Sequence, residues 1–305
     1  MQNITSNRHE LKATILVAIS ATLYGFLAYL GTELIRANFS IENMLFWRFT
    51  IAAIWMAGFY IIHKRKTIRH SLPQVRSLLP IFLLGALGYS GSCGFYFLAT
   101  RFTGTGLAMV IFFSYPMMVA ILVWLADRQS INMALVMALI AISFGLYLLK
   151  GPSTNHINLW GIFFALLAAL SYAVYVYGTK WTPKTIDSGL STIVVCLGCA
   201  SAFLLITLFT HTFVIAHTLH DWLYIIALSV FATAIPIQLM LEGLKSINPV
   251  HASILSVLEP LVTVGMGIAL LGETISAVQA IGCLIILVSA LAIQFQRISS
   301  HHSAG

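Results

Sequence analysis

The sequence predicts an all-α integral membrane protein with ten transmembrane helices, arranged as two inverted five-helix repeats. Three observations predict this fold: the composition, a series of long apolar runs, and a correspondence between the two halves of the chain. Hydrophobic residues make up 59% of the 305 residues and charged residues only 8%, and the mean hydropathy is +0.94. A soluble domain carries about a quarter charged residues. The composition therefore indicates that most of the chain lies in lipid.

Apolar runs of about 20 residues recur along the whole chain, and each is long enough to cross a hydrocarbon core of about 30 Å. We place ten of them, at approximately 13–35, 41–62, 77–99, 104–126, 131–149, 158–179, 189–210, 221–243, 249–271 and 276–295. A short polar stretch after the fifth run divides the chain into an N-terminal unit, residues 1–150, and a C-terminal unit, residues 151–305. Each unit is expected to hold five helices.

The distribution of basic residues predicts the orientation in the membrane. In a soluble protein, the net charge of +7 would suggest a nucleic-acid partner. Here, most Lys and Arg residues fall on one side if the N-terminus is cytoplasmic, as the positive-inside rule requires. The densest basic run, at 63–70, is expected to contact anionic membrane lipid. An even number of spans then makes both termini cytoplasmic, and no nucleic-acid partner is expected.

The two halves correspond when the chain is shifted so that Pro116 falls on Pro260. The same shift places Arg101 on Lys245 and brings the junctions between spans into register. Because each half has an odd number of spans, the second half must enter the membrane inverted relative to the first. Inverted repeats of this kind characterise secondary transporters, whose substrate site lies between the repeats near the midplane. The pattern therefore predicts alternating access.

Glu259 is a single carboxylate near the middle of an apolar segment, residues 252–275. An acid at that depth is costly unless a partner or a watery cavity surrounds it. Pro260 follows it and removes a backbone donor from the helix. Glu259 could bind a substrate ammonium, carry a coupling proton, or do both in competition, and the sequence does not choose among these roles. The alternative is a protonated or locally paired acid that serves packing.

Two stripes of polar residues accompany this acid. Ser256, Glu259 and Thr263 share one face of the ninth span. Tyr89, Ser92 and Tyr96 follow helical spacing on the third span. Each stripe is expected to line a substrate cavity. Hydrogen bonding between helices is the alternative for the third span, since Ser and Tyr supply it routinely in membrane bundles.

Tyrosines also mark the first and sixth spans, at Tyr24, Tyr172 and Tyr175. Under the inverted repeat, these two helices face each other across the cavity. Aromatic faces there suit an amphipathic or aromatic solute, including a cation held by the π electrons. The alternative is a belt of tyrosines at the membrane interface.

Three prolines are candidates for helix breaks or gates: Pro116, Pro236 and Pro260. A static kink is the alternative for Pro236.

Arg48 is an isolated charge within the second span. A structural ion pair with Glu33 or Glu42 is the expected role. Snorkelling toward the interface, or attraction of an anionic group of the substrate, are the alternatives.

Several short motifs resemble those of the drug/metabolite transporter superfamily, specifically its EamA-like group. They are Trp-Arg-Phe at 47–49, the 99–108 segment, Tyr-Pro at 115–116, Leu-Glu-Pro-Leu at 258–261 and Leu-Gly-Glu-Thr-Ile at 271–275. The resemblance covers roughly 13–150 and 158–295. It implies two five-helix domains that move amino acids, related metabolites or cationic drugs outward across a bacterial inner membrane without ATP. The first half departs from the pattern at 126–129, where Ala-Asp-Arg-Gln replaces Leu-Gly-Glu.

The predicted function is a secondary transporter that exports a small amphipathic metabolite, an amino acid or a relative of one, across the bacterial inner membrane by alternating access. Export of cationic drugs or other metabolites, import and exchange are alternatives. A membrane-embedded enzyme is a remote one, because the nine acidic residues are scattered singly and metal-dependent chemistry needs a cluster. No catalytic residue, metal or cofactor is expected. The expected partners are the small-molecule substrate, membrane lipid and coupling protons, and the oligomeric state stays open.

Overall fold

The computed structural model describes residues 2–68, 74–128, 133–149, 158–271 and 276–302. Every regular element in these ranges is helical, and they contain no strand. The 151–157 stretch lies outside them, as do the last residues of the basic run at 63–70 and most of the turn at 271–275.

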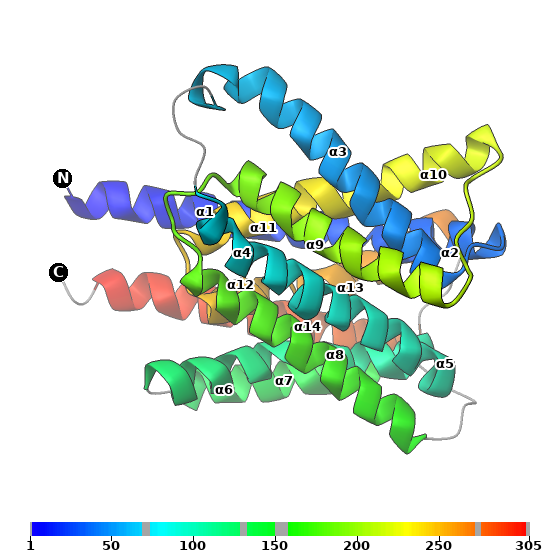
Figure 1. Ribbon diagram of the computed structural model, residues 1–305. Helices are drawn as coiled ribbons and strands as arrows, with labels where there is room; N and C mark the ends of the chain where they lie inside the picture. Colours follow the sequence, from blue (N-terminus) through cyan, green and yellow to red (C-terminus); the bar gives the residue numbers. More distant parts are fainter. Residues whose placement is uncertain (1, 69–73, 129–132, 150–157, 272–275, 303–305) are drawn as a thin grey trace.

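The helices form one elongated bundle (Figure 1). Its first half contains α1 (Gln2–Tyr24), α2 (Leu27–Arg36), α3 (Ile41–Ile68), α4 (Val75–Leu83), α5 (Ser90–Phe112), α6 (Tyr115–Asp127) and α7 (Met133–Leu149). Its second half contains α8 (Leu159–Gly178), α9 (Ser188–Phe209), α10 (Leu219–Ser229), α11 (Ile235–Leu244), α12 (Pro249–Leu255), α13 (Leu258–Leu271) and α14 (Ala277–His302). Both termini lie at the same end of the bundle, which we call the terminal end.

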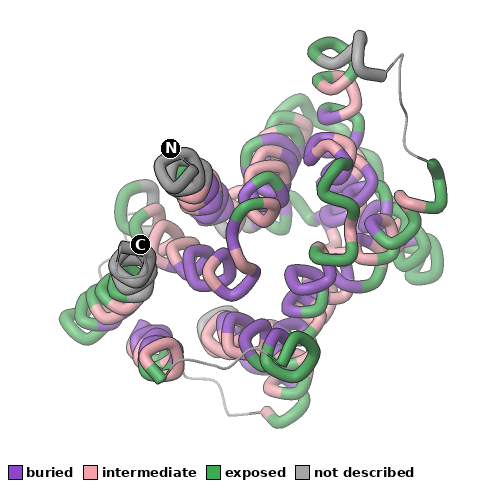
Figure 2. Tube along the Cα trace, turned by 90° about the vertical axis from the view of Figure 1, so that its left-hand side faces the viewer, coloured by how far each residue is buried: buried purple, intermediate pink, exposed green. Residues whose placement is uncertain are grey.

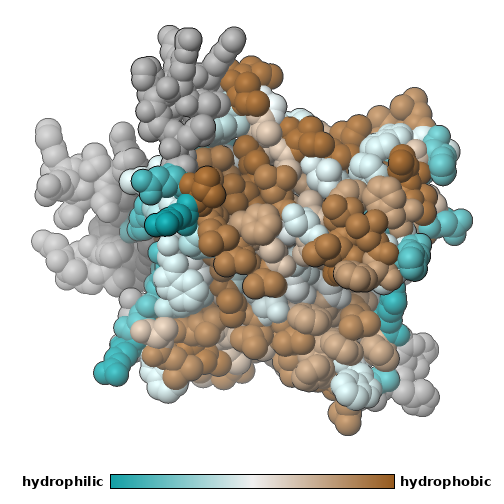
Figure 3. All heavy atoms as spheres, viewed as in Figure 1, coloured by the Kyte–Doolittle hydropathy of each residue, from teal (hydrophilic) through white to brown (hydrophobic). Residues whose placement is uncertain are grey.

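The described residues contain eight helices or helix pairs that are long and apolar enough to cross a membrane. Two shorter apolar helices, Met133–Leu149 and Ala277–Ala292, occupy the positions of the predicted fifth and tenth spans. The space-filling view shows hydrophobic residues across the middle of one face of the bundle, with hydrophilic residues toward its two ends (Figure 3), and exposed large hydrophobic residues occur on nearly every long helix. A broad exposed apolar belt of this kind is what lipid contact requires. The ten-span count and the inverted arrangement stay predictions.

Helices from the two halves pack against each other throughout the bundle. α5 lies along α8, α3 along α9, α14 along α7 and α1 along α11. Viewed from the terminal end, buried residues face the middle of the bundle and exposed residues face outward (Figure 2). Small residues allow the closest approaches: a Cβ added at Gly198 of α9 would lie 2.8 Å from the backbone nitrogen of Ala86. The halves are therefore joined by helix contacts in which the backbones nearly touch.

Interruptions in the helices concentrate near the middle of the bundle. π-helical turns join α4 to α5 (Leu84–Tyr89) and α10 to α11 (Val230–Ala234). Short non-helical turns separate α1 from α2, α5 from α6, and α12 from α13. In a membrane such interruptions are tolerated where protein or a polar cavity satisfies the freed backbone groups. They therefore indicate where a site can form.

Candidate functional site: a cavity between the two halves

A cavity of about 110 Å³ lies among these interruptions, with room for several water molecules or part of a small solute. Its lining comes from both halves of the chain. The lining residues are Tyr24, Leu27, Arg48, Tyr89, Ser92, Cys93, Tyr96, Phe97, Met109, Phe112, Phe113, Tyr115, Tyr172, Glu259 and Thr263. We call this space the central cavity. It brings together seven of the nine residues for which the sequence predicts substrate binding or coupling.

Glu259 reaches the central cavity because the helix is interrupted just before it. α12 ends at Leu255, and Glu259 lies in the first turn of α13. A helix N-terminus carries partial positive charge and favours a nearby carboxylate. Thr263, one turn later, donates to the carbonyl of Glu259 (3.1 Å) and lies equally close to the carbonyl of Gly25 (3.2 Å) at the α1–α2 interruption. Among the described residues, no hydrogen bond or ion pair holds the Glu259 carboxylate itself.

Four tyrosines build one wall of the central cavity. Tyr89 donates a hydrogen bond to the hydroxyl of Tyr24 (3.1 Å). The ring centroids of Tyr89 and Tyr172 are 5.8 Å apart, and those of Tyr172 and Tyr115 are 4.6 Å apart. Tyr24 on α1 and Tyr172 on α8 therefore lie on one aromatic surface. Such a surface suits a solute with an apolar body or a positive charge.

Two residues of the predicted site lie outside this lining. Ser256 is buried at the α12–α13 interruption, where its hydroxyl donates to the carbonyl of Ala252 (3.0 Å). Tyr175 is buried behind Tyr89, with 4.9 Å between their ring centroids. Its hydroxyl is buried without a hydrogen-bond partner among the described residues. Both therefore support the cavity wall from behind.

The three predicted helix breaks all lie beside interruptions. Pro116 and Pro260 are in the first turns of α6 and α13. Pro236 is the second residue of α11, which follows the second π-helical turn directly, and its carbonyl accepts a hydrogen bond from Ser20 (2.7 Å). Gating by any of them stays a prediction.

Arg48 differs from its expected role. Glu33 pairs with Arg36 at 2.6 Å, and Glu42 lies 3.7 Å from Arg101. The Arg48 Nε instead donates to the hydroxyl of Thr233 at 2.6 Å. The predicted ion pair with Glu33 or Glu42 is therefore wrong, because both acids have basic partners near the end of the bundle while Arg48 lies deeper, in the wall of the central cavity.

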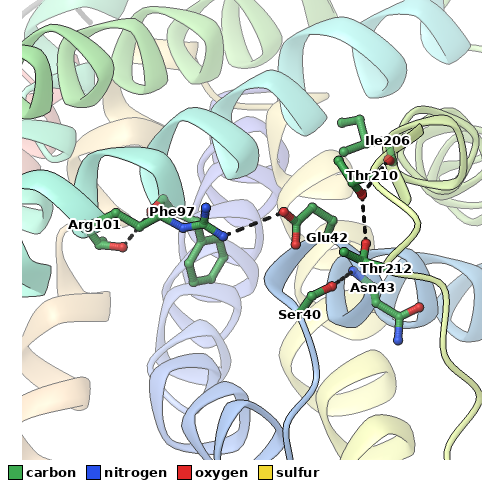
Figure 4. A network of polar contacts seen from close by, with 9 residues as sticks. Ser40, Glu42, Asn43, Phe97, Arg101, Ile206, Thr210 and Thr212 are labelled. Atoms are coloured by element: carbon green, nitrogen blue, oxygen red, sulfur yellow. Dashed lines mark hydrogen bonds and ion pairs between the residues drawn. The ribbon is translucent and has the colours of Figure 1, made fainter. Parts of the chain in front are cut away.

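The contacts of Glu42, at the start of α3, belong to a polar network (Figure 4). This start of α3 lies at the end of the bundle opposite the termini (Figure 1). Besides Arg101, this network includes Ser40, whose hydroxyl accepts from the backbone of Asn43 (3.2 Å). Nearby, Asn43 and Trp47 both donate to the carbonyl of Val214, in the segment that follows α9. These contacts fix the start of α3 to the second half of the chain.

A second cavity, of about 300 Å³, opens near the terminal end. Three lysines contribute to its lining: Lys180, Lys184 and Lys245. Lys180 is paired with Asp127, and Lys245 with Glu242 at 3.1 Å. Tyr175 contributes to the lining of this cavity and packs on Tyr89, which lines the other. Tyr89 and Tyr175 therefore connect the linings of the two cavities.

Sequence reasoning missed several apolar and aromatic lining residues, of which Tyr115 is the most informative. Its hydroxyl donates to the carbonyl of Ser253 in the second half (3.2 Å), and its side chain is only 1% exposed. The signal was available, because the shift that places Pro116 on Pro260 also places Tyr115 on Glu259.

The described residues contain no group of three or more His, Cys, Asp or Glu side chains that could hold a metal ion. Cys196 and Cys199 are fully buried free thiols on α9.

Comparison with known proteins places the chain in a family. A sequence profile of the EamA-like transporter family matches residues 11–150 and 159–295. The chain belongs to the EamA-like transporter family. With its hydrophobic belt and its candidate spans, it is a multi-pass membrane protein.

Two relatives and one solved structure show how far the likeness extends. An uncharacterised transporter of Archaeoglobus fulgidus is 31% identical over 197 residues, which are 64% of this chain and 69% of that protein. The uncharacterised transporter YcbK of Bacillus subtilis is 27% identical over 187 residues, 57% of this chain and 58% of its own length, less than two thirds of that relative. One crystal structure covers 91% of this chain and 95% of its own, with a TM-score of 0.76 and 17% identity. That structure is similar in fold alone.

Proposed function

We propose that this EamA-like transporter exports a small amphipathic metabolite, an amino acid or a relative of one, across the bacterial inner membrane by alternating access. One observation carries the proposal: a single carboxylate, Glu259, faces a tyrosine-lined cavity between the two halves, beside a helix interruption. Substrate sites of secondary transporters form at such interruptions between repeats.

Glu259 gives the central cavity a place for a positive charge. A substrate ammonium would gain a charge-assisted hydrogen bond from this carboxylate. The tyrosine rings beside it would hold the apolar part of the same solute. A proton bound to Glu259 would remove the negative charge that the ammonium needs. Competition between the two would couple substrate movement to proton movement in the opposite direction.

The arrangement of the two cavities supports alternating access. Tyr89 and Tyr172 line the central cavity, and Tyr175, which packs on both of them, lines the second cavity. A rearrangement of these three tyrosines would join the central cavity to the one near the terminal end. The two π-helical turns and the interruptions beside Pro116 and Pro260 are places where the helices can change direction. We infer that the two five-helix halves move against each other there.

The lysines of the second cavity support a cytoplasmic position for the terminal end. Lys180 and Lys184 follow α8, and Lys245 follows α11, at the end where both termini lie (Figure 1). Basic residues favour the cytoplasmic side of a membrane.

Counterflow with purified protein in liposomes tests the proposal. Vesicles preloaded with a pooled set of unlabelled amino acids would accumulate one labelled amino acid above the level of empty vesicles. A matched control uses Glu242→Gln, which removes a half-exposed acid at the terminal end and leaves Glu259 in place. Wild type and control should accumulate the same label. Failure of folded wild-type protein to accumulate any amino acid would overturn the amino-acid assignment.

A further inference from the structure

Arg48 is a buried cation in the wall of the central cavity. Its side chain is 2% exposed and lies on α3, within a membrane-spanning helix. Three contacts fix its position. The Nε donates to the hydroxyl of Thr233 (2.6 Å), a terminal nitrogen lies 3.5 Å from the carbonyl of Ala232, and the guanidinium carbon lies 5.0 Å from the centroid of the Phe49 ring.

The contacts of Arg48 leave hydrogen-bonding capacity unused. A guanidinium has five N–H donors, and the described residues accept from only two of its nitrogens, one of them at the long distance of 3.5 Å. No acid forms an ion pair with Arg48 within the described ranges. A buried charge without a counter-ion is costly inside a membrane protein. Because Arg48 lines the central cavity, its free donors face whatever fills that space.

The cavity also contains the opposite charge, at a distance. Glu259 on α13 and Arg48 on α3 line the same space and interact electrostatically. Nevertheless, no nitrogen of Arg48 lies within 4.0 Å of a carboxylate oxygen of Glu259. Arg48 and Glu259 therefore line one small cavity with opposite charges that are not in contact. A molecule that carries both a negative and a positive charge can bind between them.

We infer that Arg48 binds the carboxylate of the cargo, so that the site selects solutes with a carboxylate and an amine over the corresponding amines. The planar guanidinium fork matches a carboxylate in a bidentate geometry. This inference rests on the proposed transport function and narrows it, because a purely cationic drug would place positive charge next to Arg48. The carboxylate replaces the missing counter-ion, while Glu259 receives the amine.

Thr233 acts as the positioning residue for Arg48. Its hydroxyl accepts from Arg48 Nε and donates to the carbonyl of Leu228 at 2.8 Å. The bond to Leu228 spans the wider π-helical turn between α10 and α11, so this irregularity places the oxygen that holds the guanidinium. The arrangement therefore fixes the guanidinium in the wall of the cavity.

The test compares amino acids with amines that lack only the carboxylate. The probes are leucine with 3-methylbutylamine and phenylalanine with 2-phenylethylamine, each used to compete against counterflow in liposomes containing the full chain. Wild type should bind leucine or phenylalanine, whichever binds more tightly, at least about ten-fold more tightly than the matching amine, which is the lower end of what a charged hydrogen bond contributes. Arg48→Gln should lose about ten-fold for the amino acid and change little for the amine. Glu259→Gln should weaken both members of the pair.

A second variant keeps the test decisive if Arg48→Gln fails to fold. Thr233→Val preserves the side-chain shape and the arginine but removes the oxygen that holds it. We expect a smaller, selective loss for the amino acid, together with a normal affinity for the amine. An equal loss for both probes, in either variant, would make Arg48 a structural residue and overturn the inference.

The wild-type result separates this inference from the function on which it rests. Amines that compete as well as their amino acids would overturn carboxylate recognition and leave transport standing. Folded wild-type protein that accumulates no labelled amino acid in counterflow would overturn both.

Discussion

Tyr115 and Glu259 occupy corresponding positions in the two halves, but their side chains make different contacts. Each lies next to a proline in the first turn of a helix that follows an interruption, and each lines the central cavity. The Tyr115 hydroxyl donates to the carbonyl of Ser253 in the opposite half, and its ring packs on Tyr172. The Glu259 carboxylate makes no such contact within the described residues. The first half therefore uses this position for cohesion, and the second half leaves it available to a ligand.

The two π-helical turns also lie at corresponding positions and differ in their side-chain contacts. The shift that pairs Tyr115 with Glu259 also pairs Tyr89 with Thr233. Tyr89 donates to Tyr24 within the first half, whereas Thr233 accepts from Arg48 across the halves. Corresponding backbone irregularities thus carry different chemistry. Two halves with helix interruptions at corresponding positions can therefore differ in whether a charged side chain lies beside the interruption.

The largest effect on transport is expected from substitutions at Glu259 and Tyr115, the corresponding positions whose contacts differ between the halves. Glu259→Gln should reduce binding and flux by about a hundred-fold, because it removes a charged hydrogen bond worth about 3 kcal/mol from a low-dielectric site. Tyr115→Phe should keep most of the flux, because it removes only a neutral hydrogen bond. Counterflow by the two variants, each checked for normal folding in detergent, measures the contrast.

A larger loss of flux in Tyr115→Phe than in Glu259→Gln would contradict this assignment of roles. If Tyr115→Phe abolished flux while Glu259→Gln transported normally, the carboxylate would be a packing residue and the phenol would be the functional group.

The pH dependence of substrate affinity should also differ between the Glu259 and Tyr115 variants. Lower pH protonates Glu259 and removes the charge that attracts a substrate ammonium, so substrate affinity should fall as pH falls. Tyr115→Phe should retain this dependence, and Glu259→Gln should lose it. Affinities measured across an acidic to neutral series for the three proteins provide the test. An unchanged pH profile in Glu259→Gln would assign the titration to another group.

The first helices of the two halves provide a third contrast. In the first half, Gly25 interrupts the helix between α1 and α2, whereas α8 in the second half is continuous. A Cβ at Gly25 would meet the side chain of Val262 on α13 at about 2.5 Å, so Gly25→Ala should force α1 and α13 apart. We expect a loss of about 1–3 kcal/mol of stability. Gly265→Ala on the same helix α13 is the matched control, because a Cβ there meets nothing within 4 Å.

Thermal unfolding in detergent compares these two glycine variants. Equal melting temperatures for Gly25→Ala and Gly265→Ala would show that α1 and α13 can separate without cost.

The sequence predicted which residues line the central cavity better than it predicted the contacts that those residues make. Glu259 could be found because a carboxylate is conspicuous in an apolar segment, and the Tyr89–Ser92–Tyr96 stripe because helical spacing reveals a polar face. The partner of Arg48 could not be found, because Thr233 lies 185 residues away and is brought close by packing between the halves. Nearby acids looked more suitable, but Arg36 and Arg101 are paired with them.

The interruptions were predicted in part. Prolines indicated those beside Pro116 and Pro260, since a missing backbone donor weakens a helix locally. The π-helical turn at Leu84–Tyr89 contains no proline and depends on contact with α9, so local sequence gave no clear signal for it. The expected span count rests on hydropathy alone, and two of the ten predicted spans correspond to helices shorter than the others.

The smallest effect is expected at Tyr89, the counterpart of Thr233. Tyr89→Phe removes the hydrogen bond to Tyr24 but keeps the ring contacts with Tyr172 and Tyr175. Hydrogen bonds between membrane helices contribute about 0.6 kcal/mol on average, so the unfolding temperature should fall only slightly and amino-acid affinity should change less than in Thr233→Val. The comparison is made by thermal unfolding and counterflow on both variants. A loss of affinity in Tyr89→Phe that equals the loss in Thr233→Val would show that both π-helical turns bear on the cargo, and that the functional difference between the halves is confined to Glu259.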